Sequence, residues 1–131
     1  MKNKIFLGGT CSDTTWRKEL LKVLAVASFN PLVENWTPAC QEEERNQKNN
    51  LCNIHLYVIT KEMQGVFSIA EAIDSTHKKG KRTIFHVIPE GFEKGPLKSL
   101  EAVCTMVNIN GGTAYVDSDL TRTARVINSF F

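Results

Sequence analysis

Ser68 and Glu71 are the residues whose types and spacing most directly suggest chemistry. They stand at the start of a helix that the apolar spacing predicts from Ser68 to Lys79. A carboxylate in the first turn of such a helix can attack an anomeric carbon and hold a sugar covalently, as in retaining glycoside chemistry. The Ser-x-x-Glu spacing is also that of a capping box, in which both side chains only bind backbone N–H groups. The pattern by itself favours the cap.

A glycine-rich segment near the N-terminus is the second candidate. Gly8, Gly9, Thr10, Cys11 and Ser12 follow a short apolar strand and precede a helix. Such a turn can bring backbone N–H groups close to a phosphate, a carboxylate or a sugar hydroxyl, and a plain tight turn is the alternative. It matches neither the G-x-G-x-x-G pattern nor a P-loop, so it predicts neither dinucleotide binding nor ATP hydrolysis.

Two further pairs combine an aromatic ring with a polar group. Trp16 and Arg17 open the helix after the glycine-rich segment, where they could face a cleft. Core packing is the stronger interpretation for Trp16, and a solvated surface position for Arg17. Asn35 and Trp36, at the end of a predicted second strand, offer an amide and an aromatic face to a planar ring. They are therefore candidates for recognising a base.

Alternating strands and helices would position these residues. Strands are predicted at 4–7, 29–36, 54–59, 83–88 and 113–116, with helices at 14–27, 38–50 and 68–79, from 96 and from 119. The runs 54–59 and 83–88 are nearly all apolar, as in strands buried on both faces, so His55 and His86 are expected in the core. Pro31 favours a sheet edge for the second strand. The pattern predicts an α/β fold, a single-domain doubly wound five-stranded parallel sheet of flavodoxin-like or Rossmann-like type, with ligands at the carboxyl ends of the strands.

The length, charge and cysteine content of the chain limit the classes of partner that we expect it to bind. The 131 residues are expected to form one domain over 1–131, and a formal net charge of +2 argues against binding to a nucleic-acid polymer. We expect no membrane span and a cytoplasmic protein, since no apolar run is long enough to cross a bilayer. Four scattered cysteines, without a C-x-x-C pair, predict neither a metal site nor disulfides. The run Glu42-Glu43-Glu44 predicts a solvated helix face.

Four segments in a fixed order carry a resemblance to a known family. They are Ile5-Phe6-Leu7-Gly8-Gly9-Thr10, then Ser12 to Arg17, then Asn30-Pro31-Leu32-Val33-Glu34-Asn35-Trp36, and Gly65-Val66-Phe67-Ser68-Ile69-Ala70-Glu71-Ala72. Over most of residues 4–90 the chain resembles the nucleoside 2-deoxyribosyltransferase-like family, with a closer match to its small bacterial and phage-type branch. Enzymes of that family transfer a 2-deoxyribosyl group between bases, and close relatives hydrolyse the N-glycosidic bond of deoxynucleoside monophosphates.

The resemblance also implies roles for single residues. Glu71 takes the position of the family's nucleophile, Ser68 would contact the sugar or its 5′ group, and Gly8 and Gly9 would line the sugar pocket. Asn53 stands where the family has an aspartate that helps the base to depart, and an amide can orient a base but cannot supply a titrating proton. The resemblance further implies a homo-oligomer, a nucleoside or nucleotide substrate, and no cofactor.

Three acidic residues could supply the proton in place of Asn53, namely Asp13, Glu34 and Asp74. Two functions therefore remain open. One is an N-deoxyribosyl transferase or hydrolase with Glu71 as its nucleophile. The other is a non-catalytic nucleotide-binding module on the same fold, in which Glu71 only caps its helix. The Glu71→Gln variant separates them, because it should abolish turnover in the first and spare ligand affinity in the second.

Overall fold

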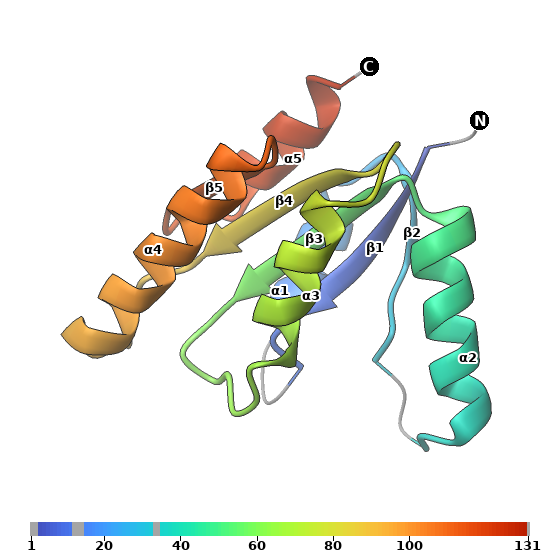
Figure 1. The fold of residues 1–131 in the computed structure, drawn as a ribbon, viewed down its shortest axis with the longest axis horizontal. Coiled ribbons are helices and arrows are strands. Elements are labelled where there is room, and N and C mark those ends of the chain that lie inside the picture. The colour runs from blue at the N-terminus through green and yellow to red at the C-terminus, as the bar shows by residue number, and fades with distance from the viewer. Residues whose placement is uncertain (1–2, 12–14, 33–34, 131) are drawn as a thin grey trace.

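Five parallel strands form one sheet in the computed structural model, which describes residues 3–11, 15–32 and 35–130 (Figure 1). The strands are β1 (Lys4–Gly9), β2 (Ala27–Phe29), β3 (Ile54–Ile59), β4 (Arg82–Val87) and β5 (Thr113–Val116), in the spatial order β2-β1-β3-β4-β5. Each neighbouring pair is parallel. The predicted α/β fold is confirmed, and this strand order is that of flavodoxin-like sheets. β2 lies at the edge, as Pro31 indicated.

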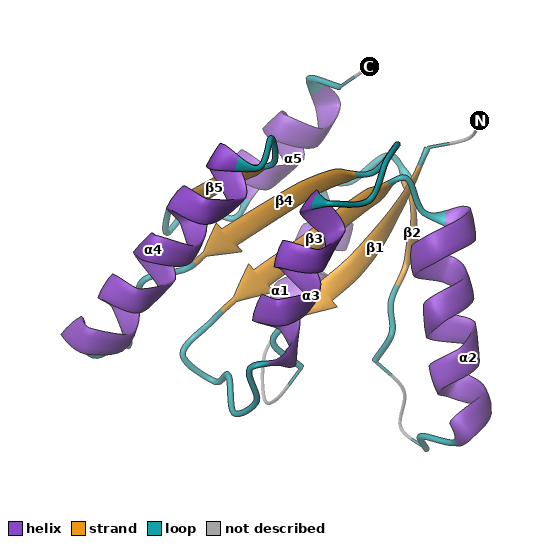
Figure 2. Cartoon of the chain, in the orientation of Figure 1, coloured by secondary structure: helices purple, strands orange, loops and turns teal. Residues whose placement is uncertain are grey.

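Helices cover both faces of the sheet (Figure 2). They are α1 (Trp16–Leu21), α2 (Pro38–Asn46), α3 (Phe67–Thr76), α4 (Lys94–Ile109) and α5 (Thr121–Asn128), and the π-helical segment η1 (Gln47–Leu51) continues α2. The predicted helix at 38–50 is therefore present, with a change of hydrogen-bond pattern in its last turn. No helix in the described part of the chain is long and apolar enough to span a bilayer.

Alternation along each strand divides the core between the two faces. In β3, Leu56 and Val58 pack with Trp16 of α1 and Ile127 of α5 on one face. On the other face, Tyr57 and Ile59 are in the hydrophobic cluster that includes Ala72 of α3 and Leu100 of α4. Every side chain of β3 is buried, which explains why its sequence is a continuous apolar run.

The first helix and the second strand are much shorter than predicted. The helix expected to reach Ala27 ends at Leu21, because the Leu20 carbonyl accepts hydrogen bonds from the N–H groups of both Val23 and Leu24 in a tight turn. Leu24 still packs against the core, so the apolar stripe was correct up to that residue, but Ala27 begins β2.

The second strand is shorter than the predicted 29–36, because β2 ends at Phe29. The side-chain oxygen of Asn30 accepts a hydrogen bond from the Leu32 N–H at 3.0 Å, an Asx-type turn that leads the chain out of the sheet. Asn35 and Trp36 therefore follow a loop and do not stand at a strand end.

Candidate active site

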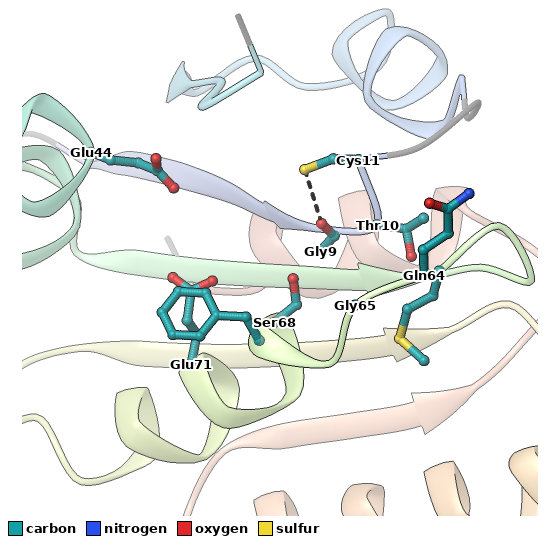
Figure 3. Close-up of a pocket in the computed structure, with 10 residues that line it drawn as sticks. Gly9, Thr10, Cys11, Glu44, Gln64, Gly65, Ser68 and Glu71 are labelled. Atoms are coloured by element: carbon teal, nitrogen blue, oxygen red, sulfur yellow. Dashed lines mark hydrogen bonds between the residues drawn. The ribbon is translucent and has the colours of Figure 1, made fainter. Parts of the chain in front are cut away.

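A cavity lies beyond the carboxyl end of β1, next to the loop that follows β3. The order of the strands reverses here, because β2 lies on one side of β1 and β3 on the other. In such sheets the crevice beyond the carboxyl ends of the two strands is the usual ligand site. A cavity of about 240 Å³ occupies it and is lined by residues from the end of β1 and just after it, from α2, from the loop that follows β3 and from α3, namely Gly9, Thr10, Cys11, Glu44, Met63, Gln64, Gly65, Phe67, Ser68 and Glu71 (Figure 3).

The Gly8-Gly9 pair belongs to β1, and the predicted turn at these residues is wrong. Gly8 faces Tyr57, and a Cβ atom built on it would lie 2.6 Å from the tyrosine ring. Gly9 has a φ of +104°, and a Cβ there would lie 2.2 Å from the Val58 carbonyl oxygen. Glycine is needed at both positions because the backbone of β1 passes close to β3. Gly9 lines the cavity, whereas Gly8 packs against Tyr57 inside the sheet and does not line it.

The side chains of Arg17 and Trp16 donate hydrogen bonds to the backbone at the end of β1. The Arg17 guanidinium donates hydrogen bonds to the carbonyl oxygens of Leu7 at 3.1 Å, Thr10 at 2.7 Å and Gly9 at 3.4 Å. The indole N–H of Trp16 donates to the Thr10 carbonyl at 2.9 Å. Arg17 is 4% exposed, so the predicted solvated position is wrong, and burial lowers the pKa of its guanidinium. Both residues shape the cavity through the backbone of β1.

Glu71 does not act in a capping box. The N-cap residue of α3 is Val66, and no side chain caps the helix, so Ser68 lies two residues past the N-cap position that this role requires. The Glu71 carboxylate instead accepts a hydrogen bond at 2.6 Å from the ammonium group of Lys48, in an ion pair whose side chains are 15% and 10% exposed for Lys48 and Glu71. Glu71 and Ser68 both line the cavity, as the functional interpretation required.

Glu44 places a second carboxylate at the cavity. It lies on α2, is partly buried, and points toward Glu71 across the cavity (Figure 3). Burial and the neighbouring Glu71 charge raise the pKa of Glu44, and Lys48 and Arg17 oppose this effect. The predicted solvated face is therefore wrong for Glu44, and neither Glu44 nor Lys48 was among the predicted site residues. Their separation by one helical turn was the available signal, since it puts both on the same face of the helix.

A second cavity of about 380 Å³ adjoins the first. Glu44, Phe67 and Glu71 line both cavities. The remaining lining residues of the second cavity are Trp36, Gln41, Arg45 and Lys48. The rings of Trp36 and Phe67 are 58% and 72% exposed, so each offers an accessible aromatic surface at the rim. Trp36 thus lines one of the two cavities, whereas Asn35 is exposed and lines neither.

Comparison with known proteins decides the family. The family described as nucleoside 2-deoxyribosyltransferase like matches residues 2–91, which include β1, α3 and all of the residues that line the two cavities. The chain belongs to this family. Glycosyl transfer is the general chemistry that membership supports, with a small-molecule nucleoside as the class of substrate. Searches of the curated proteins and of the solved structures each returned no match.

Asn53, to which the resemblance gave a role at the departing base, is not brought to Glu71. It directly precedes β3 and so lies at the amino edge of the sheet, whereas Gly9 lies at the carboxyl edge. Its amide accepts a hydrogen bond from the Lys4 N–H at 2.9 Å and donates one to Asn3 at 2.8 Å. These contacts secure the first residues of β1.

The other residues considered as proton donors, and one binding candidate, are placed as follows. Asp74 is exposed on α3 and pairs with Lys78 at 3.3 Å, so it does not line either cavity. Ser12, Asp13 and Glu34 lie outside the described residues. Among the described residues, Glu44 is therefore the carboxylate that accompanies Glu71 in both cavities.

Proposed function

We propose that residues 1–131 act as one domain that cleaves, or transfers a sugar at, the N-glycosidic bond of deoxyribonucleosides or their 5′-monophosphates, with Glu71 as the nucleophile. One observation carries this proposal: the Glu71 carboxylate faces the cavity at the switch point and is bound by Lys48, free of any helix-capping contact. Family membership supports glycosyl transfer independently of that geometry.

The two cavities suggest how the substrate lies. Trp36 and Phe67 offer ring faces to a planar base in the larger cavity. Thr10, Gln64 and Ser68 offer polar groups to the sugar and its 5′ group in the smaller one. The bond between base and sugar would then lie where the cavities meet, beside Glu71.

The reaction would proceed in two displacements. A Glu71 carboxylate oxygen attacks C1′, the C1′–N bond breaks, and its electron pair leaves with the base nitrogen. The product is a deoxyribosyl ester of Glu71. Water or a second base then attacks C1′ and releases the Glu71 carboxylate, with overall retention of configuration. Lys48 contributes by holding the carboxylate in place through the 2.6 Å hydrogen bond, so that its attacking oxygen is oriented before the substrate binds.

A chromatographic assay tests the proposal. Purified protein is incubated with deoxynucleosides and with their 5′-monophosphates, with and without an acceptor base. Wild-type protein should release free base or form the exchanged nucleoside, and Glu71→Gln should reduce the rate by about 10³-fold or more, since a nucleophile is removed. Asp74→Asn is the matched control, because it removes a carboxylate from the exposed side of the same helix.

The outcomes are distinct. Product that requires an acceptor base identifies a transferase, and product without one identifies a hydrolase. Equal rates for Glu71→Gln and wild type would refute the role of Glu71. If wild-type protein turns over none of these substrates while they still protect it against heat, the protein is a binding module and the enzymatic proposal is wrong.

A further inference from the structure

Glu44 occupies a position that the proposed function leaves unexplained. It comes from α2, on a separate segment from the Glu71 helix, and it lines both cavities at the place where they meet. Phe67 and Glu71 are the two other residues that share this position. In the substrate placement proposed above, the base and the sugar lie in different cavities, so a group at the junction can reach the nitrogen that leaves the sugar.

The surroundings of the two carboxylates differ. Glu71 has a direct ion pair with Lys48, whereas Glu44 makes no ion pair within the residues that the structure describes. The charged groups that face Glu44 are Glu71 from α3, Lys48 from η1 and Arg17 from α1. Burial and Glu71 favour the protonated form of Glu44, and the two cations favour its ionised form, with burial the largest effect. When two carboxyl groups of one site differ in this way, the environment assigns one the role of acid and the other the role of nucleophile.

Resting on the function proposed above, we propose that Glu44 is the catalytic acid and base of this site. In the first step the Glu44 carboxyl group gives its proton to the base nitrogen as the C1′–N bond breaks, so the base leaves neutral and Glu44 becomes a carboxylate. In the second step the Glu44 carboxylate takes a proton from the attacking water, or from the N–H of an acceptor base, as the new bond to C1′ forms and the Glu71 ester breaks. Protons and electron pairs balance over the two steps.

A leaving group that needs no proton separates this role from others. In 4-nitrophenyl 2-deoxyriboside the group that leaves C1′ is 4-nitrophenolate, a stable anion, so proton donation contributes little to the first step. We expect Glu44→Gln to lower kcat/KM for the deoxynucleoside that wild type uses by about 10²-fold or more, and to lower kcat/KM for 4-nitrophenolate release, which reports the first step alone, by less than about tenfold. Glu42→Gln, an exposed change two residues away on the same helix, should leave both rates unchanged.

The pH profile gives an independent readout. Wild-type kcat/KM for the deoxynucleoside should fall as the pH rises through the raised pKa of Glu44, because the acid is then ionised. In Glu44→Gln this alkaline fall should be absent.

Each result decides the question. Equal losses on both substrates would show that Glu44 acts in folding or binding, and would overturn the proposal. Unchanged rates on the deoxynucleoside would overturn it as well. If wild type and Glu44→Gln both fail to act on either substrate, the proposed function itself is wrong and the role of Glu44 falls with it. If the Glu71 test succeeds and this one fails, only the assignment of the acid is wrong.

Discussion

His55 should make the stability of this protein depend on pH between about pH 6.5 and pH 4. Its ring is fully buried in β3, with Nδ1 at 2.8 Å from the Ser75 hydroxyl and Nε2 at 2.7 Å from the Lys48 carbonyl oxygen. A carbonyl oxygen only accepts, so Nε2 carries the hydrogen and Nδ1 accepts one from Ser75. This neutral form satisfies both ring nitrogens. Burial lowers the pKa of His55 from 6.5 to about 4.

The sign and size of the effect follow from linkage. The unfolded chain binds a proton to His55 below about pH 6.5, whereas the folded chain does so only near pH 4, so acid favours the unfolded state. The contribution of the neutral imidazole is therefore fully present above pH 6.5 and is lost as the pH falls toward 4. One pKa unit corresponds to about 1.4 kcal/mol, which gives a total of about 3 kcal/mol. About 2 kcal/mol of this should be lost between pH 7 and pH 5.

Urea unfolding at pH 7 and pH 5, followed by tryptophan fluorescence, measures this loss. His55→Gln should remove about 2 kcal/mol of the pH dependence, whatever its effect on stability at pH 7. His86→Gln is the matched variant, because His86 is also fully buried with a lowered pKa, and the His55 contribution should persist in it. If wild type and His55→Gln lose the same free energy of unfolding between the two pH values, the assignment to His55 is refuted.

Gly9→Ala and Tyr57→Phe should change the free energy of unfolding in opposite directions. Gly9→Ala should destabilise by at least about 3 kcal/mol in urea unfolding, because the new Cβ would meet the Val58 backbone at 2.2 Å in a strand with positive φ. Gly80→Ala has a positive φ in open space and should cost roughly 1 kcal/mol, so equal losses for the two variants would contradict this explanation. Tyr57→Phe should raise the free energy of unfolding by about 1 kcal/mol, because the buried Tyr57 hydroxyl has no hydrogen-bond partner among the described residues. A lower melting temperature for this variant would show that the hydroxyl is hydrogen-bonded in solution.

Most of the sheet could be predicted from local pattern. The central strands β3 and β4 were recognisable because strands covered on both faces need apolar residues at every position, and the segments Ile54–Ile59 and Arg82–Val87 nearly meet that need. Pro31 marked the edge strand, since a residue without an N–H is best tolerated there. The alternation of elements then implied a site beyond the carboxyl ends of the strands, where Gly9 and Glu71 are found.

The errors arose where a distant contact overrides local preference. The pattern of α1 continues past Leu21, but the chain has to turn there to reach the edge of the sheet. Arg17 resembles an exposed helix residue, yet three carbonyl groups at the end of β1 satisfy its guanidinium inside the protein. In both cases the contact that determines the local structure is made with β1, a different element of the fold.

The sequence by itself determined most of the segments that become strands and helices, and that the candidate site would lie beyond the carboxyl ends of the strands. It did so because burial imposes a period of two on strands and 3.6 on helices, and both periods are local. The tertiary structure alone decided the chemistry of the site. Lys48 and Glu71 are 23 residues apart in the chain and 2.6 Å apart in space, and Glu44 shares a cavity with both only because the fold brings α2, η1 and α3 to that cavity. The charge around a carboxylate depends on such long-range contacts, which the periodicity of the sequence does not predict.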